Sequence, residues 1–381
     1  MKDAKKFFLG LALFAGTIIG VGIFGLPYIA SKVGFIPTIA YFLVLGGIVF
    51  VIQKVYANII VNTPGDHRYP GYAEYWLGPK WKRAMFTSNV IGFSGSILAY
   101  LIVGGTFLSS LMSSSRFEIS EVGGVLIFFS IGSLLILWGR KSVASVELWF
   151  LILFMLLVLG LVFVGWNKIE FDNLTTFNSA NLFLPFGVVM FSFWGSAVIP
   201  EVRDIVGGSK KILMKVLPAG ALVSLIVYTL FVFVTLGISG GSTSQEAIEG
   251  LKESLGSNII TIGYLFGFIT TFTSFLTLGL TIKNIYHFDF KIPLIYSWML
   301  ACFIPLALYF IGLTNFIDVI MFIGAVLLGF EGIVILKMYQ KVRLKVNPEL
   351  TKTPWWMYLV GTVFVIGVLG VVYYFVKNYL V

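Results

Sequence analysis

The sequence predicts an all-α integral membrane protein, and three observations carry that prediction. Of its 381 residues, 58% are hydrophobic and only 11% are charged, whereas soluble globular proteins carry about 25% charged residues. Apolar windows of about twenty residues, the length that crosses a bilayer core roughly 30 Å thick, recur along the chain. None shows the two-residue alternation of a membrane β-strand. A soluble fold is therefore excluded.

Eleven such windows are expected to form membrane-spanning helices. Short connections join them, so the chain, residues 1–381, is expected to be a single transmembrane domain with no sizeable domain outside the membrane. The windows lie at residues 7–32, 36–61, 84–112, 121–138, 143–166, 181–203, 212–239, 258–282, 293–313, 315–337 and 356–378.

The basic residues predict the orientation. When the connections are assigned to alternate sides with the N-terminus in the cytoplasm, the outer side receives Lys32, Arg116, Lys168, Lys252 and Lys377, which leaves 21 of the 26 Lys and Arg residues inside. Cytoplasmic loops are rich in Lys and Arg, so the N-terminus is expected in the cytoplasm and the C-terminus outside a cell membrane. The net charge of +9 thus reflects the orientation of the chain in the lipid bilayer, and no nucleic acid partner is predicted.

Several kinds of chemistry are excluded by the residues present. The single cysteine, Cys302, permits no intrachain disulfide and no thiolate metal site. His67 and His287 both fall in polar connectors, so no histidine cluster forms in the membrane. Residues 1–30 carry too long an apolar stretch for a cleaved signal peptide. An integral membrane enzyme is disfavoured because no histidine, cysteine or paired carboxylate cluster lies at one interface.

The first window is unusually rich in glycine. Gly20 to Gly25 matches the letters of a dinucleotide-binding motif, but no strand precedes it and no acidic residue follows about twenty positions later. Close packing of helices explains any single glycine. The sixth window, however, holds a similar interruption at 192–196, flanked by Pro185 and Pro200. Two broken helices five spans apart are the pattern of an inverted repeat, here expected as residues 1–166 and 181–338, with 356–378 as an additional helix.

A break in a membrane helix predicts a ligand site. Freed N–H and C=O groups cost several kcal/mol each in lipid, so a break persists only where a ligand, ion or water satisfies them. The N-terminus of each half-helix also carries about half a positive charge. A carboxylate is expected to dock on the amides near Gly20 and Gly22, and freed carbonyls can hold a cation or an ammonium group.

The same segments resemble a known family. Residues 16–27 and 30–35 resemble the first helix of the amino acid/auxin permease family, especially its prokaryotic hydroxy and aromatic amino acid permease branch. Residues 191–201 are similar to the sixth helix of that family, and residues 273–280 to the eighth. The resemblance implies the leucine-transporter (LeuT) fold of the amino acid, polyamine and organocation superfamily. Ser196 departs from the pattern, because many relatives carry a histidine there.

The candidate substrate site combines both interruptions. The first is expected to hold the carboxylate through backbone amides and one hydroxyl, and the second to close aromatic rings over an apolar side chain. Tyr100, in the middle of the third window, is expected to reach the carboxylate or the outer path, or to cap a neighbouring carbonyl. The predicted site residues are Thr17, Ile19, Gly20, Val21, Gly22, Tyr100, Phe191, Ser192, Phe193, Trp194, Gly195 and Ser196.

Two kinds of residue could couple transport to an ion. By resemblance, Thr273 and Ser274 of the eighth window would join carbonyls near Gly20 in a sodium site, although such hydroxyls also bond their own helix. Glu147 and Glu331 lie deepest among the acids of the windows, and an intramembrane acid is a functional candidate by default. Either could carry a proton, or could pair with a basic residue at the inner gate.

These observations favour a secondary active transporter that imports a neutral L-amino acid, apolar or aromatic, by alternating access. Proton symport is preferred, because the resembling branch is proton-coupled and acids lie in the bundle. Sodium symport remains open, as does an amino acid sensor built on a transporter scaffold. No cofactor is predicted beyond the coupling ion.

Overall fold

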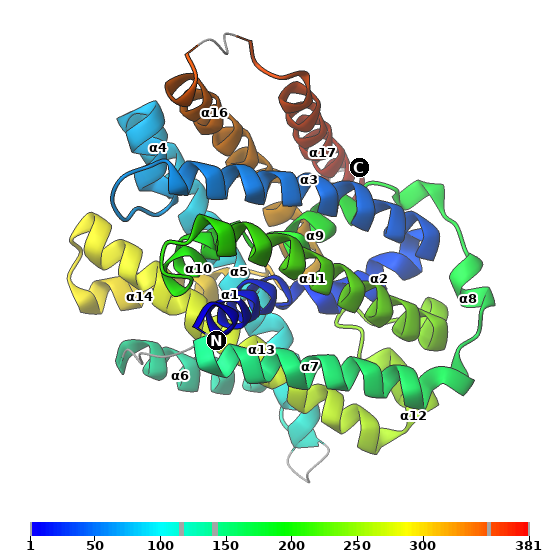
Figure 1. Ribbon diagram of the computed structural model, residues 1–381. Coiled ribbons are helices and arrows are strands. Elements are labelled where there is room, and N and C mark those ends of the chain that lie inside the picture. Colours follow the sequence, from blue (N-terminus) through cyan, green and yellow to red (C-terminus); the bar gives the residue numbers. More distant parts are fainter. Residues whose placement is uncertain (1, 114–117, 139–143, 349–351, 380–381) are drawn as a thin grey trace.

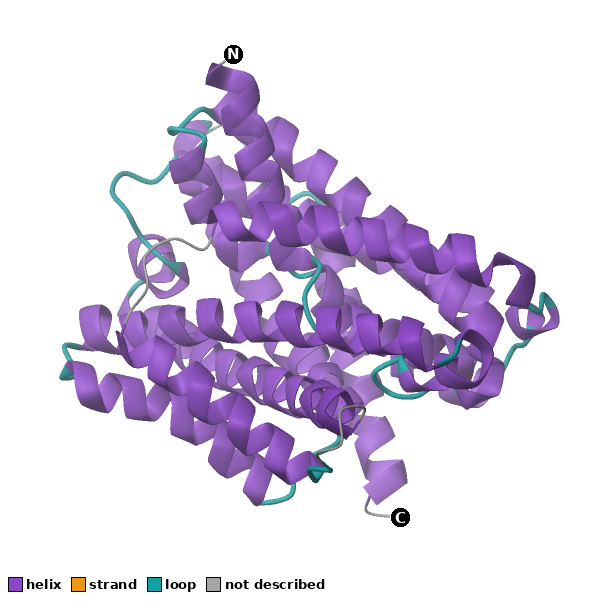
Figure 2. Cartoon of the chain, turned by 90° about the horizontal axis from the view of Figure 1, so that it is seen from below, coloured by secondary structure: helices purple, strands orange, loops and turns teal. Residues whose placement is uncertain are grey.

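The structure, a computed structural model, describes residues 2–113, 118–138, 144–348 and 352–379, and all regular structure in those ranges is helical (Figures 1 and 2). The uninterrupted long helices are α3 (Phe35–Val61), α5 (Pro79–Ser113), α6 (Glu121–Trp138), α7 (Ala144–Gly165), α11 (Lys210–Ser239), α13 (Ser257–Asn284), α14 (Leu294–Phe310) and α17 (Trp355–Tyr379).

Three further spans are built from consecutive segments. The first of these spans consists of α1 (Lys2–Ile18) and α2 (Gly22–Val33). The second consists of α9 (Leu184–Phe193), the 3₁₀ turn η3 (Ser196–Val198) and α10 (Ile199–Ile205). The third consists of α15 (Phe316–Phe322), the π-helical turn η7 (Ile323–Leu327) and α16 (Leu328–Val346). The connections hold η1 (Trp166–Lys168), η2 (Ser179–Asn181), η4 (Gly240–Ser242), η5 (Glu249–Leu251), the π-helical turn η6 (Ile285–Asp289), and the short helices α4 (Tyr69–Leu77), α8 (Asp172–Thr175) and α12 (Lys252–Leu255).

Each of the eleven predicted windows coincides with one of these spans. Within the described ranges, eight helices are long and apolar enough to cross a membrane, and the bent pair α1 and α2 makes a ninth candidate. The remaining two windows correspond to shorter apolar helices at Ile152–Lys168 and Leu294–Phe310. The predicted all-α membrane architecture, with its first and sixth spans discontinuous, is confirmed.

Helices α5 and α16 extend well beyond their predicted windows. Helix α5 begins at Pro79 because Gly78, at a φ of 96°, turns the chain, and proline fits a first turn that needs no amide donor. Helix α16 continues to Val346, and its last turn carries Arg343 and Lys345. Cations favour a helix C-terminus. An apolar window detects only the lipid-buried part of a helix, so it misses such polar extensions.

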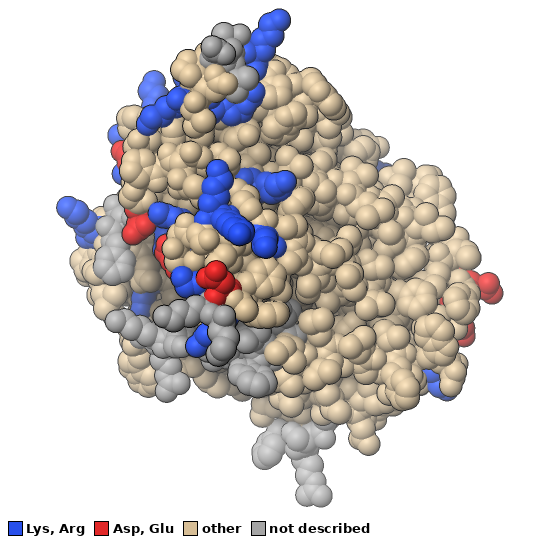
Figure 3. All heavy atoms as spheres, viewed as in Figure 1, with Lys and Arg blue, Asp and Glu red and all other residues tan. Residues whose placement is uncertain are grey.

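The broken spans lie at the centre of the bundle. Helix α1 packs against α11 and α7, and α9 packs against α2, α3 and η7. Helix α17 lies at the edge beside α16 (Figure 1). Lys and Arg side chains gather around the N-terminus and one end of the helices, whereas the other end shows few of them (Figure 3). We call the end where α1 begins and α10 and α16 terminate the basic face.

Two glycines allow α9 to touch the η7 turn directly. A Cβ atom added to Gly187 of α9 would fall on the Met321 carbonyl, and one added to Gly324 of η7 would fall on the Gly187 carbonyl. Backbone therefore packs on backbone at this crossing, as small residues permit between membrane helices. The contact holds the second broken span against the segment that leads into α16.

Candidate substrate and ion site

The first break exposes backbone amides at a helix start. Helix α1 ends at Ile18 and α2 begins at Gly22, with a bend of 48° between them. The amides of Ile23 and Phe24 donate to carbonyls of the break at 3.3 and 3.1 Å. In the described chain, the amides of Val21 and Gly22 have no backbone acceptor. Together with the helix dipole, these amides favour an anionic group such as a carboxylate.

The second break lies between α9 and α10. Helix α9 ends at Phe193, Trp194 and Gly195 leave the helix, and the chain resumes helical structure at η3. Pro200 stands in the first turn of α10, where its missing amide costs no hydrogen bond. The Gln53 side chain of α3 donates to the freed Phe193 carbonyl at 3.0 Å. Sequence reasoning missed Gln53, although a polar side chain inside an apolar window signals a buried partner.

Tyr228 of α11 joins the two breaks. Its hydroxyl lies 2.6 Å from the Ile18 carbonyl and 2.8 Å from the Ser192 carbonyl. One hydroxyl has one proton, so it donates to one carbonyl at a time. At the same crossing, a Cβ atom on Gly22 would lie 2.5 Å from Ser192 Oγ. Sequence reasoning also missed Tyr228, whose single polar atom inside an apolar window was its only signal.

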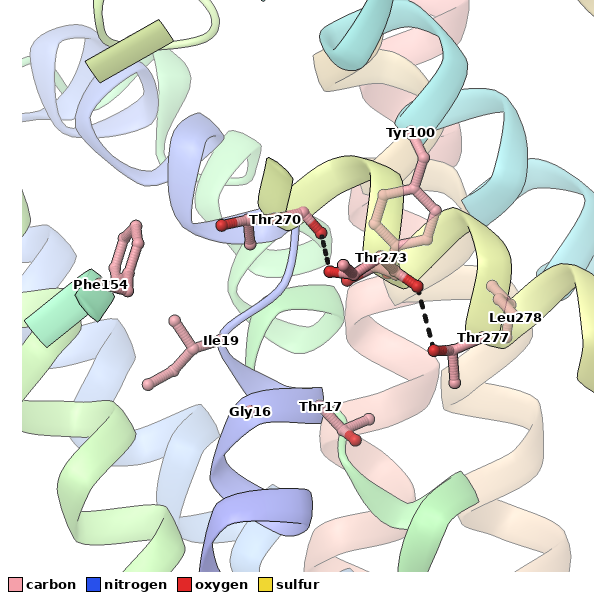
Figure 4. Close-up of a pocket in the computed structure, with 10 residues that line it drawn as sticks. Gly16, Thr17, Ile19, Tyr100, Phe154, Thr270, Thr273, Thr277 and Leu278 are labelled. Carbon is pink, nitrogen blue, oxygen red and sulfur yellow. Dashed lines mark hydrogen bonds between the residues drawn. The ribbon is translucent and has the colours of Figure 1, made fainter. Parts of the chain in front are cut away.

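A pocket opens beside the first break (Figure 4). Phe154 of α7 lies on one side of the unwound segment, and Tyr100 of α5 lies on the other with the hydroxyl-bearing wall of α13. A Cβ atom on Gly20 would lie 3.4 Å from the Tyr100 hydroxyl, so this tyrosine faces the break. The lining residues are Gly16, Thr17, Ile19, Tyr100, Phe154, Thr270, Thr273, Ser274, Thr277 and Leu278. Five of the predicted site and ion residues are thus brought together.

The hydroxyls along α13 are bonded within their own helix. Thr273 Oγ1 donates to the Thr270 carbonyl at 3.1 Å, and Thr277 Oγ1 donates to the Thr273 carbonyl at 3.0 Å. Thr17 Oγ1 likewise donates to the Leu13 carbonyl at 2.8 Å. Each oxygen keeps a lone pair for another partner. This wall can therefore accept hydrogen bonds from an ammonium group or coordinate a small cation.

Aromatic rings pack around Phe154, which lines the pocket. Phe24 of α2 makes edge contacts with Phe107, Phe154 and Phe231, at ring centroid distances of 5.0, 6.5 and 6.2 Å. The rings come from four different helices, and Phe24, Phe107 and Phe231 are fully buried. The cluster supplies an apolar surface next to the first break.

The predicted residues of the second break do not line this pocket. Ser192 donates to the Val188 carbonyl of its own helix at 2.8 Å. Phe193 packs its ring on Tyr228 at 4.9 Å. Gly195 packs on Ile18 of α1. Phe191 packs against the hydrophobic core. In this conformation, the contribution of these residues is to position the first break.

A second group of buried polar atoms lies outside this pocket. The Asn89 amide of α5 donates to Glu331 Oε1 of α16 at 3.3 Å, and both side chains are buried. Trp194 Nε1 and Ser196 Oγ of the second break, and the Tyr69 hydroxyl of α4, are buried without a hydrogen-bond partner in the described chain. Glu147 lies in α7, but its side chain falls outside the part that the structure describes.

Two ion pairs fasten α10 to the loop before α4. Arg68 Nε lies 3.0 Å from Glu201 Oε1, and Arg203 lies 3.3 Å from Asp66. All four side chains are partly or largely exposed at the basic face, so each pair contributes about 0.2–1 kcal/mol at most. The pairs connect α10, the second half of a broken span, to the loop before α4, and breaking them costs little free energy.

Comparison with protein families decides the membership of this chain. Residues 3–375 match the model of the tryptophan/tyrosine permease family. The chain belongs to that family. The permease is 29% identical to tyrosine-specific transport system 1 of Haemophilus influenzae over 290 residues, which cover 70% of each chain. It is 24% identical to the tryptophan-specific transport protein of Pseudomonas aeruginosa, over 70% of this chain and 66% of that one.

The fold of the permease also matches a solved structure. The crystal structure of MhsT in complex with L-phenylalanine aligns with a TM-score of 0.60 and 16% identity, covering 97% of this chain and 98% of that one. MhsT has the LeuT fold, so the predicted fold class is confirmed. The permease is a transmembrane amino acid transporter and not an enzyme.

Proposed function

We propose that this permease imports an aromatic L-amino acid by alternating access. The observation that carries the proposal is the first break, where the Val21 and Gly22 amides have no backbone acceptor in the described chain and the preceding residues Thr17 and Ile19 line a pocket walled by hydroxyls and aromatic rings. The amides suit a carboxylate, the α13 hydroxyls suit an ammonium group, and Phe154 and Tyr100 suit a ring. The tyrosine-specific and tryptophan-specific transport proteins named above support an aromatic substrate.

Proton symport through Glu331 is the coupling that we propose. Glu331 is 4% exposed and lies in a membrane-spanning segment. In the described chain, no basic side chain lies within 4.0 Å of it, so its charge is not neutralised by an ion pair. Burial of an unpaired carboxylate favours the protonated form. The acid can therefore bind a proton in one conformation and release it in another.

Sodium symport is a second candidate, and the pocket gives it a specific basis. Thr273 and Ser274 line the same pocket as Ile19 and Gly16, next to the unwound segment. Hydroxyl and carbonyl oxygens are suitable ligands for a hard cation. The two candidates predict different ion requirements for the same substrate.

Transport by the purified permease in proteoliposomes tests these proposals. Saturable uptake of labelled L-tyrosine or L-tryptophan, with unlabelled aromatic amino acids as competitors, is expected when an inward proton gradient is imposed. Replacing sodium with choline should leave that uptake unchanged. Uptake that requires a sodium gradient and ignores pH would overturn the proton proposal, and binding without uptake would favour a sensor.

Glu331→Gln is the matching variant. Glutamine retains the size and the hydrogen-bonding capacity of the side chain but cannot release a proton. Accumulation driven by the proton gradient should be lost, while exchange of labelled for unlabelled substrate across the membrane continues. Undiminished proton-driven accumulation by this variant would exclude Glu331 as the proton carrier.

A further inference from the structure

A crevice of about 440 Å³ separates the first turns of α1 from the first turns of α11 at the basic face. Just beyond it the helices close on each other, because a Cβ atom added to Gly10 of α1 would lie 3.1 Å from Val206 and 3.3 Å from Val216 of α11. The crevice therefore ends where the two spans pack together. The lining residues are Asp3, Ala4, Phe7, Phe8, Ser209, Lys211, Ile212 and Lys215.

The lysines around this crevice have no anionic partner. Lys211 and Lys215 line it and are exposed. Lys6 reaches the turn that leads into α11, because a Cβ atom on Gly207 would lie 2.6 Å from Lys6 Nζ. In the described chain, none of these three lysines forms an ion pair or lies over an aromatic ring. Asp3 is the one acid of the lining, so positive charge is in excess.

Part of the crevice wall is apolar. The Phe8 side chain is 59% exposed and meets the Phe7 ring edge-on at a centroid distance of 5.5 Å. These residues and Ile212 stand at the start of the apolar windows 7–32 and 212–239, where lipid headgroups give way to acyl chains. Lysines at this depth extend their ammonium groups toward the headgroups while their stems cover apolar surface. Ammonium groups and apolar surface thus lie side by side.

We propose that this crevice binds an anionic phospholipid, with its phosphate group on Lys211 and Lys215 and an acyl chain along Phe8. Such a lipid combines the two chemistries that the crevice offers, whereas inorganic phosphate leaves Phe8 uncovered. A cytoplasmic orientation explains why lysines gather on this face. It does not explain why they converge on an amphipathic crevice between two helices.

A lipid in the crevice fastens α1 to α11. Helix α1 ends at the first break, and the Ile18 carbonyl at that end accepts a hydrogen bond from Tyr228 of α11 at 2.6 Å. The lipid bridges the same two helices at the opposite end of α1. A ligand that binds the folded protein alone stabilises it. Anionic lipid is therefore expected to raise the midpoint of thermal unfolding.

The double variant Lys211→Gln/Lys215→Gln tests the site, with Lys80→Gln/Lys341→Gln as the matched control. All four side chains are exposed, and in the described chain none of them forms an ion pair. Lys80 lies at the start of α5 and Lys341 near the end of α16, both outside the crevice. The two double variants thus remove the same charge from different places. Lys211→Arg/Lys215→Arg keeps the charge of the site.

The measurement is equilibrium binding of radiolabelled dioleoylphosphatidylglycerol by the full-length permease in a non-ionic detergent. Unlabelled phosphatidylglycerol, phosphatidylcholine and inorganic phosphate serve as competitors, and thermal unfolding is the second readout. We expect saturable binding that unlabelled phosphatidylglycerol alone displaces. Each lysine near an anionic lipid surface strengthens binding about fivefold, so the crevice variant should bind about thirtyfold more weakly. The control and the arginine variant should bind like the wild type.

Phosphatidylglycerol should raise the unfolding midpoint of the wild type and of the control, and should leave that of the crevice variant unchanged. Equal losses of binding in the two glutamine variants would show that net charge alone attracts the lipid, and would overturn the site. Displacement by inorganic phosphate would make the crevice a simple anion site, and displacement by phosphatidylcholine would remove the role of the lysines. Either result would also overturn the proposal. The binding assay requires no transport, so its outcome is independent of the proposed function.

Discussion

At the scale of single residues, the two glycines of the first break have different tasks. Gly20 faces Tyr100, which lines the pocket, and a Cβ atom would meet the Tyr100 hydroxyl at 3.4 Å, an ordinary contact distance. Gly22 faces the other broken span, where a Cβ atom would lie 2.5 Å from Ser192 Oγ and 2.9 Å from Ser192 Cα. The first glycine leaves room for a ligand, and the second lets the two breaks cross.

This difference predicts opposite outcomes for small substitutions. Gly22→Ala must push the two breaks apart and should destabilise the permease by about 1–3 kcal/mol, as overpacking does in tight interiors. Gly20→Ala should fold normally, whereas Gly20→Leu should fill the break and abolish substrate binding. Thermal unfolding in detergent and binding of labelled substrate measure both effects. Gly47→Ala on α3, where a Cβ atom meets nothing within 4 Å, is the control.

At the scale of elements, each broken helix is completed by a neighbour that remains continuous. Helix α3 supplies Gln53 to the end of α9, and α11 supplies Tyr228 to the ends of both α1 and α9. Backbone carbonyls that lose their helical partners in the membrane need such donors. The unbroken helices therefore supply the hydrogen-bond donors that allow the two central spans to be interrupted within the membrane.

Tyr228→Phe should remove that support from both breaks. The Ser192 carbonyl would lose its donor, whereas the Ile18 carbonyl keeps the Gly20 amide at 2.8 Å. One buried carbonyl left unpaired predicts a loss of about 1–3 kcal/mol. Thermal unfolding should show the loss, and substrate affinity should fall with it. Tyr264→Phe removes a buried hydroxyl that has no partner in the described chain, so it should change stability little. Equal stability of the two variants would contradict the capping role.

At the scale of the whole molecule, most of the architecture could be predicted from the sequence. Lipid demands long apolar segments with internally bonded backbone, so the eleven windows are visible in composition alone, and clustered glycine or proline marks the two interruptions. The partners of those interruptions could not be predicted. Which lone polar side chain reaches which carbonyl, as with Tyr228, depends on helix packing that no local pattern encodes.

The site shows the same limit. Residues that are close in sequence lie in different surroundings in the structure: Thr17 and Ile19 line the pocket, whereas Gly22 packs on Ser192. The acid Glu331 was visible as an intramembrane charge, but its hydrogen-bond partner Asn89 comes from a distant segment. A periodic pattern states which side chains are buried; it does not state which of them meet.

The orientation of the whole molecule is a final prediction, because the charge asymmetry of the connections acts on the chain as a unit. We expect the basic face in the cytoplasm. Cys302 is buried and is the single cysteine, so Cys302→Ser gives a background free of thiols. On it, Lys210→Cys at the start of α11 and Lys252→Cys at the start of α12 place exposed thiols at opposite faces. In intact cells, a membrane-impermeant maleimide should label the variant at 252 alone, and permeabilised cells should label both. Labelling of the variant at 210 in intact cells would invert the orientation.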